Sequence, residues 1–155
     1  MIDIRRLFLI AVCLFSLLSL GACSAGQIYS PDEIHGDVSF VSGGVTIVGT
    51  LNYIKGKDMT FTVKEPENIS GTVFTSQDIS FSEIKINYGK MKNNSPVNIL
   101  FEILSDFLGK AAEIPLKGEY SYSGAVSSAG YKIIIDCENS EIKSIETEKF
   151  TYSFE

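Results

Sequence analysis

The chain has 155 residues, of which 45% are hydrophobic, and a formal net charge of −6. This length suits one domain with a short leader, and the hydrophobic content excludes global disorder because it is enough to form a core. No block of basic residues follows Arg6, which argues against nucleic acid as a partner and against a polybasic lipid-binding surface.

The N-terminal segment has the three regions of an export signal. Arg5 and Arg6 are followed by an uncharged apolar run from Leu7 to Leu20, which is shorter than the roughly 20 residues of a membrane span. The run ends in the motif LGAC, whose last residue is Cys23. An aliphatic residue, two small residues and a cysteine resemble the bacterial lipoprotein signal. An uncleaved anchor helix or an ordinary secretory signal is the alternative.

The resemblance implies that residues 1–22 are a signal peptide and that Cys23 carries a diacylglyceryl group. Two acyl chains, at about 0.8 kcal/mol per buried methylene, would hold the mature protein stably on the membrane. We therefore expect an extracytoplasmic protein anchored to the cell membrane or to an outer membrane. Cys13 lies in the leader, so a modified Cys23 leaves Cys137 alone and excludes a disulfide within the mature chain.

The segment after Cys23 is polar, contains glycine and proline, and has no hydrophobic period. This composition predicts a lipidated tether over residues 23–36 and a single β-rich domain over residues 37–155. His35, the only histidine of the chain, falls in the tether and is expected to be an ordinary surface residue.

From Asp37 onward apolar and polar residues alternate, as in half-buried β-strands. The runs are GVTIVGTLNYI, KDMTFTVKEP, GTVFTSQ, DISFSEIKINYG, GEYSYSG, YKIIIDCEN and EIKSIETEKFTYSFE. The alternation places these apolar sets on single faces: Val45, Ile47, Gly49, Leu51 and Tyr53; Met59, Phe61 and Val63; Tyr131, Ile133, Ile135 and Cys137; Phe150, Tyr152 and Phe154.

Short links between these runs favour antiparallel neighbours. They lie at Gly43-Gly44, Lys55-Gly56 and Asn139-Ser140, which are typical turn residues. Pro66 is expected to end a strand because it cannot donate to a ladder. Phe81 is out of phase with the residues that follow it, which predicts a bulge near Ser82-Glu83.

One segment, SPVNILFEILSDFLGKAA, has the period of a helix. Ser95 is the expected cap, Pro96 suits the first turn and Gly109 is a suitable stop. The apolar stripe consists of Val97, Leu100, Ile103, Leu104, Phe107 and Leu108, and Phe101 widens it. A stripe this wide predicts a helix buried against the concave face of the sheet, so the fold class is α+β and mainly β.

The sequence offers no catalytic or metal-binding motif, and we expect no enzyme, no metal and no cofactor. Glu65 with Glu67, and Glu146 with Glu148, are carboxylate pairs that could share one side of a strand, although solvated strand edges are the favoured explanation. Cys137 shares the face of apolar residues, which favours a buried, inert thiol.

The segment PENISGTVF resembles the bacterial lipoprotein-sorting carriers (LolA/LolB-like) through Pro66, Ile69, Gly71 and Phe74. INYGK, the amphipathic helix and YKIIIDCENSEIKSIE follow in a similar order. The resemblance implies an unclosed antiparallel β half-barrel with a helix in its mouth and a cavity for acyl chains. The mature region contains no arginine, so no residue matches the carriers' lipid-receiving arginine.

These observations lead to two functional hypotheses. In the first, the protein is a lipid-anchored lipoprotein that binds an apolar ligand, an acyl chain or a lipidated partner. Its candidate cavity residues are Phe61, Phe74, Ile86, Leu100, Ile103, Leu104 and Phe107. In the second, the same aromatic and aliphatic side chains fill the core, and the protein is a structural or interaction module without such a ligand.

Overall fold

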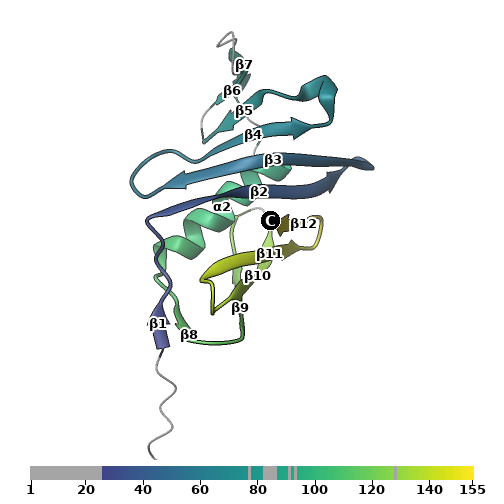
Figure 1. Cartoon of the computed structure of the whole chain (residues 1–155). Helices are drawn as coiled ribbons and strands as arrows, with labels where there is room; N and C mark the ends of the chain where they lie inside the picture. Colours follow the sequence, from purple (N-terminus) through teal and green to yellow (C-terminus); the bar gives the residue numbers. More distant parts are fainter. Residues whose placement is uncertain (1–25, 77, 82–86, 91, 93, 128) are drawn as a thin grey trace, which may run out of the picture.

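The computed structural model describes residues 26–76, 78–81, 87–90, 92, 94–127 and 129–155. The leader, Cys23, Ile86 and the bulge expected near Ser82-Glu83 lie outside the described residues. The described chain is mainly β and contains one α-helix, α2 (Pro96–Gly109), and one short 3₁₀ helix, η1 (Glu67–Ile69). The antiparallel strands curve around α2 without closing into a barrel, which confirms the predicted fold class (Figure 1).

Ten strands form one sheet in the order β7-β6-β5-β4-β3-β2-β12-β11-β10-β9, and β1 pairs with β8 in a separate ribbon. Their bounds are β1 (Gly26–Ile28), β2 (Glu33–Ser42), β3 (Val45–Ile54), β4 (Thr60–Glu65), β5 (Thr72–Thr75), β6 (Asp78–Phe81), β7 (Asn87–Lys90), β8 (Glu113–Pro115), β9 (Glu119–Ala125), β10 (Gly130–Asp136), β11 (Glu141–Thr147) and β12 (Thr151–Phe154). Consecutive strands pair within β2–β7 and within β9–β12, so the β12–β2 pairing joins two meanders.

The turns follow the predicted chemistry. Gly43 and Gly44 both have positive φ, 59° and 81°, as a two-residue β-hairpin requires, and Ser42 pairs with Val45 across them. Strand β4 ends at Glu65, immediately before Pro66. The sequence therefore predicted these strand ends correctly.

Helix α2 begins where the sequence predicts. The Ser95 hydroxyl accepts a hydrogen bond from the Asn98 N–H at 3.2 Å, and Pro96 occupies the first turn. The helix ends at Gly109, but the left-handed residue that turns the chain away is Ala111, with φ of 46°. Gly109 is therefore the last helical residue rather than the residue that reverses the chain.

The chain leads from β7, at one edge of the ten-stranded sheet, through α2 and β8 to β9 at the other edge, so the helix crosses the concave face (Figure 1). Its buried residues include the whole predicted stripe except Leu108, which is half-buried; they are Val97, Ile99, Leu100, Phe101, Ile103, Leu104 and Phe107. The Tyr152 hydroxyl donates to the Pro96 carbonyl at 2.8 Å and ties the start of the helix to β12.

From Gly26 to Gly36 the chain is folded, which corrects the described part of the tether expected over residues 23–36. Gly26 to Ile28 pair with β8, and β2 already begins at Glu33. Between these strands, Tyr29 is 4% exposed and its N–H donates to the Ala112 carbonyl at 2.7 Å. The composition of this segment is typical of a tether, but one aromatic ring and a three-residue strand are enough to fix it to the domain.

Replacing Leu100 or Leu104 by alanine tests the burial of the helix. Both side chains are fully buried, so each change should lower the free energy of unfolding by about 2–5 kcal/mol through lost transfer energy and a residual cavity. Urea unfolding of the mature chain measures the loss. Leu116→Ala is the matched control because Leu116 is 49% exposed, and it should cost less than about 0.5 kcal/mol. Equal losses at all three positions would contradict the packing of α2.

Candidate functional site

The predicted cavity residues form part of the core. Phe61, Leu100, Ile103, Leu104 and Phe107 are fully buried, and Phe74 is half-buried against them. Aromatic rings pack directly on one another, with centroids 6.4 Å apart for Phe61 and Phe74. Four hollows lined by described residues involve other side chains. The arrangement favours the filled core over a central cavity.

The remaining candidate groups do not form a reactive site. Cys137 is 1% exposed, and burial, with a smaller effect of Asp136, raises the pKa of its thiol, so the predicted buried thiol is confirmed. Glu65 ends β4 whereas Glu67 lies on η1, and all four paired glutamates are exposed. Within the described residues no group of three His, Cys, Asp or Glu is arranged to hold a metal ion.

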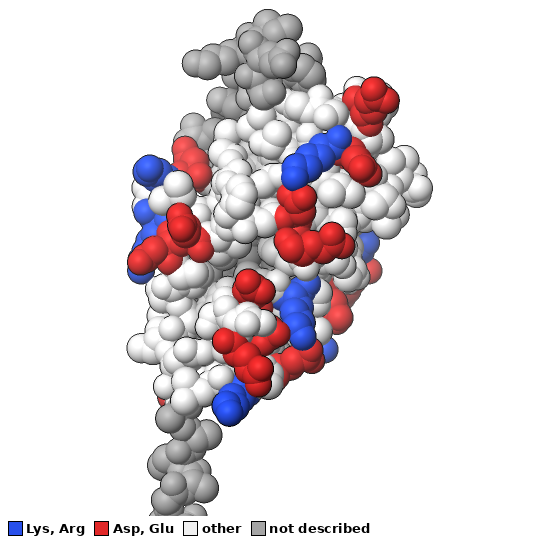
Figure 2. Space-filling view, viewed as in Figure 1, with Lys and Arg blue, Asp and Glu red and all other residues white. Residues whose placement is uncertain are grey.

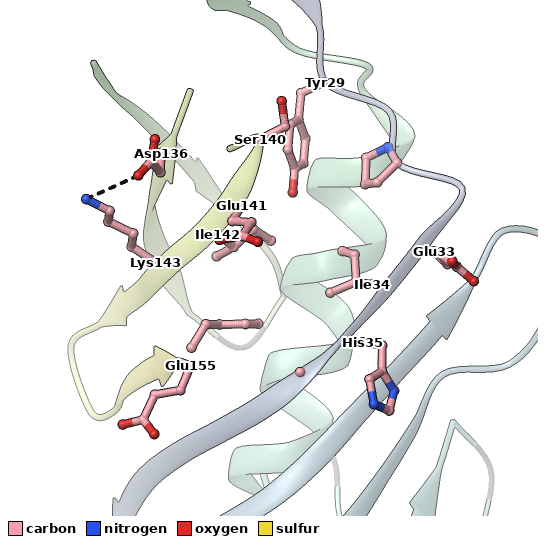
Figure 3. A pocket seen from close by; sticks show the side chains of 13 residues that line it. Tyr29, Glu33, Ile34, His35, Asp136, Ser140, Glu141, Ile142, Lys143 and Glu155 are labelled. Atoms are coloured by element: carbon pink, nitrogen blue, oxygen red, sulfur yellow. Dashed lines mark ion pairs between the residues drawn. The ribbon is translucent and has the colours of Figure 1, made fainter. Parts of the chain in front are cut away.

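A slot between β2 and β11 has a volume of about 450 Å³ (Figure 3). We use the word slot for the space lined by Tyr29, Pro31, Glu33, Ile34, His35, Gly36, Asp136, Ser140, Glu141, Ile142, Lys143, Phe154 and Glu155. Tyr29 and Ile34 lie on one side of the slot, and Glu141 and Ile142 lie on the other side, on β11 (Figure 3). Tyr29, Ile34, Ile142 and Phe154 give the slot its apolar surface.

The slot forms because β12 lies between β2 and β11 and pairs with each of them over only part of its length. Strand β12 pairs with β2 at Val38 and Ser39, whereas β2 continues back to Glu33 beside the slot. The segment from β1 to β2 closes one end: Tyr29 packs on Phe107, with ring centroids 5.5 Å apart. The Gln27 side chain donates to the Cys137 carbonyl at 3.1 Å and fixes this segment to the end of β10.

Main-chain groups of β2 face the slot. Asp37 exchanges two hydrogen bonds with Glu155, of 3.2 and 2.9 Å, so both of its main-chain groups point away from β3. The main-chain N–H and C=O groups of successive residues point to opposite sides of a strand. Those of His35 and Glu33 therefore point the same way as those of Asp37. No strand of the described residues lies beside them on that side. The slot therefore presents an open stretch of sheet edge.

The charge at the slot is negative. Lys143 is bound to Glu119 at 2.8 Å and to Asp136 at 3.7 Å, and these carboxylates raise its pKa. Glu141 and Glu155 form no ion pair within the described residues. Burial, and then the nearby Glu141 charge, raise the pKa of Tyr29 to about 12, so its hydroxyl stays protonated at neutral pH. Acidic side chains also cover more surface than basic ones on the face in Figure 2.

Sequence reasoning missed the slot because its two walls are far apart in the chain. Ile34 lies in the presumed tether and Ile142 in a strand more than a hundred positions later. The one signal that could have indicated it was the presence of Tyr29 and Ile34, together with Ile28, in a largely polar segment. His35, expected as a surface residue, is exposed and contacts the Asn52 side chain on β3.

Comparison with protein-family models and with curated proteins finds no match to this chain. The similarity to lipoprotein-sorting carriers therefore remains a prediction. Among the described residues, α2 is too short to span a bilayer and no other helix is long and apolar enough to do so.

A polar cluster on the exposed side of α2 gives a pH-dependent test of the helix position. Asp106 accepts hydrogen bonds from Lys110, at 2.6 Å, and from the Tyr131 hydroxyl of β10. These bonds, that of Lys110 first, lower the pKa of the Asp106 carboxyl. A lowered pKa means that ionised Asp106 stabilises the fold above its unfolded pKa of about 3.9, and that this contribution is lost as the pH falls below it.

We expect Asp106→Asn to lower the free energy of unfolding by about 1–3 kcal/mol at pH 7, because a charge-assisted link between α2 and β10 is weakened. The difference in the free energy of unfolding between this variant and the wild type should become smaller when urea unfolding is measured at pH 3. Asp58→Asn is the control, since Asp58 is exposed and accepts one bond, from Ser76 at 3.1 Å. A deficit for Asp106→Asn that does not change with pH would count against this assignment.

Proposed function

We propose that this protein is a lipid-anchored extracytoplasmic lipoprotein that binds an extended segment of a partner protein in the slot. It is a binding module and not an enzyme. The observation that carries the proposal is the coincidence, in one hollow, of open main-chain groups, an apolar lining and two carboxylates, Glu141 and Glu155, that form no ion pair with the described residues.

These features match what an added β-strand requires. An extended peptide forms main-chain hydrogen bonds with an exposed sheet edge, and pockets for its alternate side chains give specificity. Here His35 and Glu33 offer the main-chain groups, and Ile34 and Ile142 lie in the apolar part of the slot. Glu141 and Glu155 favour a segment that carries lysine or arginine. The ligand class is therefore a basic peptide with alternating apolar residues.

The anchor is supported by the leader and its LGAC motif. Cys23→Ser removes the thiol that would receive the diacylglyceryl group, and it should leave unprocessed precursor in the membrane fraction. The mass of the wild-type N-terminal peptide should show cleavage before Cys23 and two added acyl chains. A Cys23→Ser chain that is cut after Ala22 and stays anchored as before would exclude the lipoprotein assignment.

Peptide binding can be measured by fluorescence anisotropy with a short, capped peptide that alternates lysine and valine. The double variant Glu141→Lys/Glu155→Lys should weaken binding by about tenfold or more, because it reverses the two unpaired charges. A peptide alternating glutamate and valine should bind the wild type less well than the lysine peptide does. Both replaced side chains are exposed, so the fold should be retained.

Glu65→Lys/Glu67→Lys is the matched control, because it makes the same change of net charge at exposed positions outside the slot. It should leave the affinity within about twofold of the wild type if the slot, rather than the overall acidity, binds the peptide. An equal loss of peptide affinity in the two double variants would contradict the slot as the binding site.

Binding of an apolar ligand beneath α2 is the second candidate. It is favoured by the open sheet, whose concave face is covered by one helix that meets it largely through apolar side chains. A fatty acid or lipopeptide that enters there should raise the stability by about 2.7 kcal/mol at a hundredfold excess over Kd. Phe107→Ala should change the affinity where folding survives. A thermal-shift series without any shift would favour the filled core.

A further inference from the structure

The fold begins much closer to Cys23 than the composition of the chain suggests. Gly26 is already the first residue of β1, so only Ser24 and Ala25 separate it from Cys23. Three residues span at most about 10 Å when fully extended. If Cys23 is lipidated, as proposed above, the β1–β8 ribbon cannot lie far from the lipid headgroups.

This ribbon also carries the most exposed apolar side chain of the described residues. Ile28 on β1 is 70% exposed, and Leu116, which directly follows β8, is 49% exposed. Glu113 and Lys117, both exposed, add one charge of each sign, so the ribbon has no net charge that would repel a bilayer. The surface around β1 is mainly uncharged in Figure 2, and the ribbon forms one end of the molecule in Figure 1.

From the short spacer and these two side chains we infer that the β1–β8 ribbon is a membrane-contact surface, with Ile28 and Leu116 inserted among the lipid headgroups. The acyl chains of Cys23 enter the bilayer beside the ribbon, and the apolar side chains add a second attachment. Two attachments restrict the orientation of the domain, whereas a lipid on a long tether would leave the domain free to rotate. The inference rests on the proposed lipidation of Cys23.

The chain contains no tryptophan, so one introduced tryptophan reports its own surroundings. The test uses the full chain, processed in cells and reconstituted in phosphatidylcholine vesicles with or without brominated acyl chains. Ile28→Trp and Leu116→Trp should show blue-shifted emission that brominated lipid quenches. Ile69→Trp is the control: Ile69 is 37% exposed and lies on η1, at the end of the molecule away from the ribbon (Figure 1). Its emission should not be quenched.

The outcomes separate the two proposals. Mass spectrometry of the same preparation shows whether Cys23 carries its lipid. Lipidated protein in which neither Ile28→Trp nor Leu116→Trp is quenched overturns membrane contact and leaves the anchor intact. Protein without lipid at Cys23 overturns the anchor and the inference together. Equal quenching of these two variants and of Ile69→Trp also overturns the inference, because the contact would then not be confined to the ribbon.

Discussion

The burial of α2 in the concave face is the interaction on which the rest of the structure depends. The two meanders of the sheet share only the short β12–β2 ladder, so their relative position is set chiefly by the helix packed across both. Each fully buried leucine or phenylalanine contributes about 1.5–3 kcal/mol of transfer energy, and α2 supplies several of them. Polar contacts at Asp106 and Pro96 then fix the helix against β10 and β12.

The same packing bears on where the described hollows lie. Buried side chains of α2 pack on those of the sheet, and the four described hollows are lined by none of Phe61, Leu100, Ile103, Leu104 and Phe107. The slot lies where β2 and β11 separate, and its lining residues come from the segment before β2 and from β2, β10, β11, β12 and their turns rather than from α2. Tyr29 belongs to both regions, since its ring packs on Phe107 and also lines the slot. A change in the helix position would therefore alter the slot directly.

Local patterns in the sequence predicted the elements well. The helical period of residues 97–108 and the cap at Ser95 predicted α2. The alternation of apolar and polar residues predicted the buried faces that include Phe61 on β4, Ile133 on β10 and Tyr152 on β12. The folded segment from Gly26 to Gly36 was missed, because its stability comes from distant partners, Ala112 and Phe107, that no local pattern marks. The slot was missed for the same reason.

The pairing of β12 with β2 has a consequence for the order of events during biogenesis. Ser39 and Ser153 are neighbours in the sheet but come from opposite ends of the domain sequence. Non-local pairings of this kind slow folding, because the entropy of closing a long loop must be overcome before the contact is gained. The sheet cannot be completed until β12 has been synthesised. The proposed export signal implies that the chain crosses the membrane unfolded. The delay would help to keep it unfolded, because β2 has no β12 to pair with until translocation is nearly finished.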